Sequence, residues 1–198
     1  MSAADELAQV AAEVNACKLC KLYKTATRGV PGEGPADAKI MFIGEAPGFN
    51  EDRQGRPFVG AAGQFLEELL ALAGLRRQDV FIANVVKHRP PNNRDPEPDE
   101  IGACAGYMDR QIAAIDPRVI VTLGRFSMAR WFPGERISRI HGQPRWADGR
   151  LHDAARRRSG SGGSDRPPTP TAPASAVRRN RPRRGHDRSR RGAARSTP

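Results

Sequence analysis

The sequence has few aromatic residues, few cysteines and no long hydrophobic run. Aromatic residues make up 6% of its 198 positions, and there are three cysteines. No stretch is long and apolar enough to span a membrane, and the N-terminus lacks the basic and apolar regions of a signal peptide. We therefore expect a cytoplasmic protein in a reducing setting, where three cysteines suit thiols or metal ligands better than disulfides.

Bulky apolar residues are almost absent from residues 151–198. This segment has no Ile, Met, Phe, Tyr or Trp, and it carries 13 Arg and 3 Asp, whereas residues 1–150 carry 20 basic and 19 acidic residues. Nearly all of the formal net charge of +11 therefore belongs to the tail. Because so little apolar surface cannot offset the entropy cost of folding, we predict one domain over 1–150 and a disordered Arg-, Pro-, Gly- and Ser-rich tail over 151–198.

The tail has two possible origins. The amino-acid composition changes abruptly after about residue 150, and the fold before this point lacks its expected end. Both observations favour the hypothesis that the tail is GC-rich DNA translated out of frame. A natural basic tail is the commoner explanation of such a composition.

Short apolar runs alternate with helical periodicity in the first 150 residues. We predict strands at 39–43, 79–86 and 118–123, and helices at 3–15, 64–73, 99–115 and 125–132. This alternation favours an α/β fold with a parallel sheet and right-handed crossovers.

A glycine-bounded loop follows the first predicted strand. The segment 44–48 (GEAPG) is followed by Glu51, Asp52 and the segment 57–60 (PFVG). In a parallel sheet, a loop with carboxylates and an aromatic ring at the carboxyl end of the first strand indicates the floor of a ligand pocket.

The cysteines form a possible metal site. Cys17 and Cys20 are in a C-x-x-C motif, and His88 precedes Cys104 by sixteen residues. Spacing alone is compatible with a tetrahedral zinc site or with an iron–sulfur cluster that has one His ligand. It is equally compatible with no metal, in which case Cys104 is a core residue and the C-x-x-C motif is incidental or redox-active.

Together these motifs resemble those of the iron–sulfur (type 4) uracil-DNA glycosylases. The matching segments occur in order over about residues 7–150, and this makes the resemblance specific. They are Cys17-x-x-Cys20-x-Leu22, Gly44-Glu45-Ala46-Pro47-Gly48-x-x-Glu51-Asp52, Pro57-Phe58-Val59-Gly60-x-x-Gly63, Asn84-Val85-Val86-Lys87 with Arg89-Pro90-Pro91, Asp99-Glu100-Ile101-x-x-Cys104, and Pro117-x-Val119-Ile120-Val121-x-Leu123-Gly124.

The resemblance implies a three-layer α/β/α sandwich around a short parallel sheet, in a protein that is a monomer when intact. It implies hydrolysis of the N-glycosidic bond of uracil in DNA, so that uracil-containing DNA is the partner. It also implies a structural [4Fe–4S] cluster, with zinc as the less favoured alternative. The implied ligands are Cys17, Cys20, Cys104 and His88, where His88 takes a position that is Cys in the common pattern.

The resemblance also implies roles at the pocket. Phe58 stacks on the extruded base, Asn84 recognises the O4 and N3–H edge of uracil, and Gly44 and Ala46 offer backbone groups. Glu45 is the first candidate for catalysis and Asp52 the second. Taken singly, each of these residues has another explanation: Phe58 suits a core position, Asn84 suits a turn cap and Glu45 suits an ion pair.

One motif of the family is absent. After a fourth strand the family has a His-Pro motif whose His donates to uracil O2, but no His in residues 125–198 precedes Pro. We therefore predict that the last strand and helix are missing, which leaves the edge of 118–123 open to aggregation, and that excision is slowed by about 10²–10³-fold or more. The alternative is a non-catalytic protein that binds DNA through its basic tail.

Overall fold

The structure, a computed structural model, describes residues 1–155. Its helices are α1 (Ala3–Asn15), α2 (Phe49–Gln54), α3 (Ala61–Leu72), α4 (Pro98–Ile115), α5 (Arg125–Ala129) and α6 (Ile137–Ile140), with single-turn helices η1 (Lys21–Lys24), η2 (Arg77–Asp79) and η3 (Pro91–Asn93). Its strands are β1 (Ile40–Gly44), β2 (Phe81–Asn84), β3 (Val119–Leu123), β4 (Arg145–Ala147) and β5 (Arg150–Ala155).

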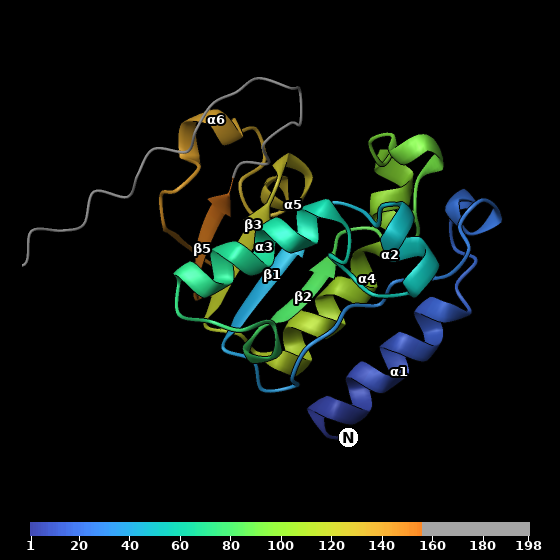
Figure 1. Ribbon diagram of the computed structural model, residues 1–198, viewed down its shortest axis with the longest axis horizontal. Coiled ribbons are helices and arrows are strands. Elements are labelled where there is room, and N and C mark those ends of the chain that lie inside the picture. Colours follow the sequence, from blue (N-terminus) through green and yellow to red (C-terminus); the bar gives the residue numbers. More distant parts are fainter. Residues whose placement is uncertain (156–198) are drawn as a thin grey trace, which may run out of the picture. The chain divides into compact units, whose positions relative to one another are not determined.

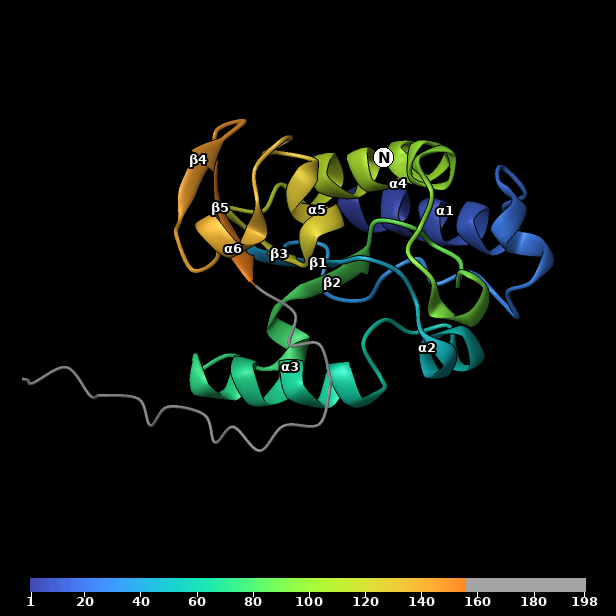
Figure 2. The ribbon, with the colours of Figure 1, turned by 90° about the horizontal axis from the view of Figure 1, so that it is seen from above.

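These strands form one sheet in the order β2-β1-β3-β5-β4. All neighbouring pairs are parallel except β4 and β5. Figure 1 shows β2, β1, β3 and β5 side by side, and Figure 2 shows α1, α4 and α5 on one face of the sheet and α3 on the other. The predicted α/β sandwich around a parallel sheet is confirmed.

Alternating side chains of β1 build a core on each face of the sheet. Met41 and Ile43 pack with Met108 and Ile112 of α4, whereas Phe42 joins a second cluster that includes Leu66 and Leu70 of α3. This alternation follows from the two-residue period of a strand. It places the carboxyl ends of β1 and β2 between the two helical layers.

The N-terminal helix has the bounds that the sequence predicts. Ser2 accepts a hydrogen bond from the Asp5 backbone N–H at 3.2 Å, and the Asp5 carboxylate accepts one from the Ser2 N–H at 3.0 Å. This reciprocal capping box satisfies backbone donors that the first turn leaves unpaired. Within residues 1–155, no helix combines the length and the apolar character that a membrane crossing requires.

The prediction that the last strand is missing is wrong. β5 pairs in parallel with β3 from Val119↔Leu151 to Leu123↔Ala155, so the predicted open edge does not exist. The predicted aggregation at this edge therefore loses its basis. The predicted absence of a helix after this strand, the frameshift and the remainder of the predicted tail concern residues outside the described part of the chain.

A tight turn explains why β5 forms. Asp148 and Gly149 join β4 to β5, and both have positive φ values, 44° and 77°. Asp-Gly is a favoured pair for such two-residue hairpins, because both central residues must adopt left-handed conformations. β4 then becomes the edge strand.

Candidate active site

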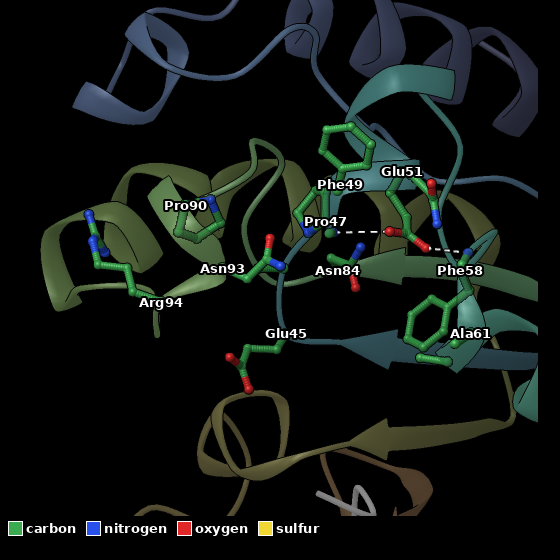
Figure 3. A pocket seen from close by; sticks show the side chains of 15 residues that line it. Glu45, Pro47, Phe49, Glu51, Phe58, Ala61, Asn84, Pro90, Asn93 and Arg94 are labelled. Atoms are coloured by element: carbon green, nitrogen blue, oxygen red, sulfur yellow. Dashed lines mark hydrogen bonds between the residues drawn. The ribbon is translucent and has the colours of Figure 1, made fainter. Parts of the chain in front are cut away.

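A cavity of about 350 Å³ lies at the carboxyl ends of β1 and β2. Four predicted site residues line it: Glu45, Ala46, Phe58 and Asn84. Figure 3 shows them with the other lining residues, which come from four segments of the chain. The remaining lining residues are Pro47, Gly48, Phe49, Asn50, Glu51, Gly60, Ala61, Ala62, Pro90, Asn93 and Arg94.

Gly44, the last residue of β1, lets two of these side chains approach the strand. A Cβ atom at Gly44 would lie 2.4 Å from Asn84 Oδ1 and 2.5 Å from Phe58 Cζ. Separations this short are not tolerated, so the Phe58 ring and the Asn84 amide share the space that a glycine leaves. The structure thus brings Gly44, Phe58 and Asn84 together.

Phe58 is held in a backbone conformation that an aromatic residue rarely adopts. Its φ is 51°, and its side chain is 8% exposed. Arg77 Nη1 donates to the Phe58 carbonyl at 2.9 Å, and Gly63 passes so close that a Cβ there would lie 2.0 Å from that oxygen. A left-handed conformation of this kind persists only where the surrounding contacts determine it.

Glu51 provides the other contacts that hold this loop. Its Oε1 accepts hydrogen bonds from the Val59 and Gly60 N–H groups, both at 2.8 Å, and its Oε2 accepts one from Gly48 N–H at 3.1 Å. Figure 3 draws the bonds from Gly48 and Gly60. Glu51 therefore ties the start of α2 to the segment that carries Phe58. No site role is predicted for it from the sequence, although its place three residues after Gly48 is that of a capping-box glutamate.

Asn84 ends β2 and points its amide into the cavity. The residue is 2% exposed, and its Oδ1 has no hydrogen-bond partner within the described part of the chain. A buried amide oxygen without a partner costs free energy, so this acceptor is suited to a ligand donor.

Glu45 follows directly after β1 and lines the cavity (Figure 3). It is partly buried, and its backbone carbonyl accepts a hydrogen bond from Val86 N–H at 3.1 Å. This hydrogen bond extends the β1–β2 pairing by one residue beyond β1. It therefore fixes the position of the Glu45 backbone, from which the carboxylate projects.

Asp52, the second catalytic candidate, does not line the cavity. It is 4% exposed, and its Oδ1 accepts hydrogen bonds from the backbone N–H groups of Thr27 at 2.8 Å and Arg28 at 3.4 Å. Because α2 turns Asp52 away from Glu51, its carboxylate anchors the segment before β1 instead. No helix is predicted from the sequence at residues 49–54, so the sequence could not distinguish the orientations of these two carboxylates.

The predicted metal ligands have two sets of electrostatic neighbours. The three cysteines influence one another, whereas the charged group that influences His88 is Asp52. The pKa of Cys104 is raised to about 11, mainly by burial and to a smaller extent by the charges of Cys20 and Cys17, so these thiols lie within electrostatic reach of one another. Burial lowers the pKa of His88, and the charge that opposes this is that of Asp52. Over residues 1–155, no three His, Cys, Asp or Glu side chains are grouped closely enough to hold a metal ion.

A buried cavity at the carboxyl edge of a parallel sheet is the usual ligand site of an open α/β protein. Comparison with known families is more specific. The model of the uracil DNA glycosylase superfamily matches residues 31–187, and the chain belongs to this superfamily.

The chain is also similar to several curated proteins. The type-4 uracil-DNA glycosylase of Sulfurisphaera tokodaii is 58% identical over 139 residues, which cover 69% of this chain and 63% of that protein. The corresponding proteins of Saccharolobus solfataricus and Thermotoga maritima are 53% identical over 145 residues and 47% identical over 143 residues. These matches cover 70% and 71% of this chain, and 67% and 74% of those proteins.

Proposed function

We propose that the chain is a uracil-DNA glycosylase, which hydrolyses the N-glycosidic bond of uracil in DNA and so starts base excision repair. The observation that carries this proposal is the buried Oδ1 of Asn84, which has no hydrogen-bond partner within residues 1–155 and lies beside the Phe58 ring in a cavity at the end of β1 and β2. The names of the similar proteins support the same activity.

Base recognition follows from the two side chains that Gly44 admits. The ring of Phe58 stacks on an extruded pyrimidine, and Asn84 Oδ1 accepts from the N3–H of uracil while its Nδ2 donates to O4. Cytosine has an acceptor at N3 and a donor at its exocyclic nitrogen, so both bonds are mismatched. The rigid support of Phe58 by Glu51 and Arg77 favours this selectivity, because it keeps the slot narrow.

Glu45 is the candidate catalytic carboxylate. A carboxylate at the end of β1 either orients the attacking water or stabilises the positive charge that develops on the sugar as the bond to the base breaks. Negative charge develops on uracil at the same time, and the His-Pro donor that would stabilise it at O2 is absent from this sequence. We therefore propose that excision by this chain is impaired by about 10²–10³-fold or more.

A uracil-containing oligonucleotide tests the proposal. We expect the chain to release uracil slowly, and to release it much faster when its C-terminus is restored to the alternative reading frame. In the restored chain, Asn84→Ala removes both base-reading groups and should slow excision by at least about 10²-fold. Full activity of the unrestored chain would contradict the impairment, and an inactive restored chain with an intact fold would contradict the function.

We also propose that a [4Fe–4S] cluster is bound by Cys17, Cys20 and Cys104. When bound, it links the segment after α1 to α4, which is a structural contribution. The electrostatic influence of Cys17 and Cys20 on Cys104 supports this, and His88 as fourth ligand stays a prediction. Visible absorption and iron content of the purified chain test the cluster; a colourless protein with bound zinc would contradict it.

His88→Cys tests the fourth position. If residue 88 is a ligand, the substitution should alter the visible spectrum while iron content is kept, and His88→Ala should lower iron content. Spectra and iron contents identical to those of the unsubstituted chain in both variants would exclude His88 as a ligand.

A cytoplasmic location suits the three free thiols.

A further inference from the structure

Phe49 is an exposed aromatic residue on the edge of the cavity. It is the first residue of α2, it lines the cavity, and it is 52% exposed. In the view of Figure 3 it lies on the other side of Asn84 from Glu45. Single exposed apolar residues are common on protein surfaces, so exposure alone assigns Phe49 no role.

Two guanidinium groups flank the Phe49 ring. Arg53, one turn later on α2, has its Cζ 5.6 Å from the ring centroid, and Arg89, which follows β2, has its Cζ at 5.2 Å. Both distances are within the range of cation–π attraction. Two segments that are distant in sequence therefore meet at this ring.

Neither guanidinium is neutralised by a carboxylate within residues 1–155. The ion pairs of this part of the chain involve neither Arg53 nor Arg89, and the one hydrogen bond of Arg89 goes from its Nε to Asn93 Oδ1 at 2.7 Å. Most of the other arginines beside the cavity and η2 have acidic partners, as Arg94 has Glu100 and Arg56 has Glu33. The edge of the cavity therefore has two uncompensated positive charges beside an exposed aromatic face.

We propose that Phe49, Arg53 and Arg89 form a subsite for the nucleotide next to the extruded uracil. A nucleotide inside the cavity stays joined by phosphates to its neighbours, which must cross the cavity edge. An aromatic face binds a base by stacking regardless of its identity, and guanidinium groups bind the phosphates. Because phosphate is a stronger partner for guanidinium than a ring, DNA draws Arg53 and Arg89 away from Phe49 and opens the ring to the base. This inference rests on the proposed function.

Single-stranded oligonucleotides with 2-aminopurine next to one uracil test the subsite in the full-length chain. Stacking on Phe49 changes the fluorescence of 2-aminopurine, and the basic tail does not report at this position. We expect Phe49→Ala to abolish the fluorescence change and to weaken binding by about tenfold, in line with the usual contribution of a stacked base. Phe49→Trp should retain both effects.

The chain offers a matched control and a charge test. Phe65 on α3 is 47% exposed and does not line the cavity, so Phe65→Ala should leave the fluorescence change intact. Arg53→Gln should lower the slope of log affinity against log salt concentration by about 0.7, the value for one phosphate of a single strand.

The outcomes separate this inference from the function on which it rests. If the unsubstituted chain prefers uracil DNA to thymine DNA but Phe49→Ala leaves the fluorescence change and the affinity unaltered, the subsite is wrong and the function stands. If the unsubstituted chain shows no preference for uracil, the proposed function and the subsite both fail.

Discussion

At the scale of single residues, the site depends on what one glycine leaves open. Gly44 admits the Phe58 ring and the Asn84 amide to the same space, and Glu51 and Arg77 hold the Phe58 loop in place. The sequence motif predicted which residues meet there. It did not reveal the positive φ of Phe58 or the carboxylate that maintains it, because both depend on contacts between segments.

Gly44→Ala should therefore destroy the pocket. The new Cβ would overlap Asn84 Oδ1 and Phe58 Cζ, so both side chains must move, at a cost of about 1–3 kcal/mol in the free energy of unfolding. Denaturant unfolding measures the cost, and the affinity for uracil measures the loss of the slot.

A control for this substitution lies on α4. Gly106 is inside the helix, and a Cβ atom added there would meet open space, so Gly106→Ala should raise the free energy of unfolding by about 0.5–1 kcal/mol. A Gly44→Ala variant as stable as the unsubstituted chain, with unchanged uracil binding, would contradict the assigned crowding.

A second residue-scale prediction concerns acid. The Glu100 side chain is fully buried, and it accepts hydrogen bonds from Arg94 at 2.9 and 2.7 Å, which lower its pKa. A lowered pKa means that the pair stabilises the fold fully above the usual carboxyl range, and that this contribution is lost as the pH falls through the depressed value. Arg94→Gln should lower the free energy of unfolding near neutral pH and lower it progressively less in acid.

Urea unfolding at a series of pH values measures this dependence. Arg139 is exposed and forms no ion pair within residues 1–155, so Arg139→Gln should cost little at any pH. A cost for Arg94→Gln that does not change between neutral and acid pH would rule out the ion pair as its cause.

At the scale of elements, β5 completes the sheet. It covers the outer edge of β3, where Val119 and Leu123 would otherwise present an unpaired strand. Periodicity does not reveal this strand, because Arg150–Ala155 contains one bulky aliphatic residue, Leu151, and has no apolar run. The Asp148-Gly149 pair, which favours a hairpin turn, is the sequence feature that could have indicated this strand.

This assignment predicts different behaviour for two truncated chains. A chain that ends at Ala155 keeps β5 and should remain monomeric in size-exclusion chromatography. A chain that ends at Gly149 exposes the edge of β3 and should aggregate, because an open apolar edge pairs with other chains. Equal behaviour of the two chains would show that β5 does not protect this edge.

At the scale of the whole molecule, the net positive charge and the pocket belong to different parts of the chain. Residues 1–155 contain equal numbers of basic and acidic residues, so the net charge of +11 belongs to residues 156–198. Binding of DNA through phosphates is steeply dependent on salt and indifferent to the base, whereas the proposed base recognition takes place in the cavity.

Removal of residues 156–198 should therefore separate two kinds of DNA binding. We expect the shortened chain to lose most of its salt-dependent affinity and to keep a preference for uracil over thymine DNA. Titrations at several salt concentrations measure both. If the preference disappears with the tail, the alternative of a non-catalytic DNA-binding protein gains support.

Local signals in the sequence predicted the α/β class, the N-terminal helix, and the motifs that bring Glu45, Phe58 and Asn84 to one edge of the sheet. These depend on local periodicity, capping and strand order, which a sequence displays directly. Packing, in contrast, determines that Glu51 faces the loop of Phe58 while Asp52 faces Thr27. It also determines that His88 has Asp52 as its charged neighbour and that β5 covers β3. Each of these depends on which distant segments share a contact, and that is settled by packing rather than by spacing along the chain.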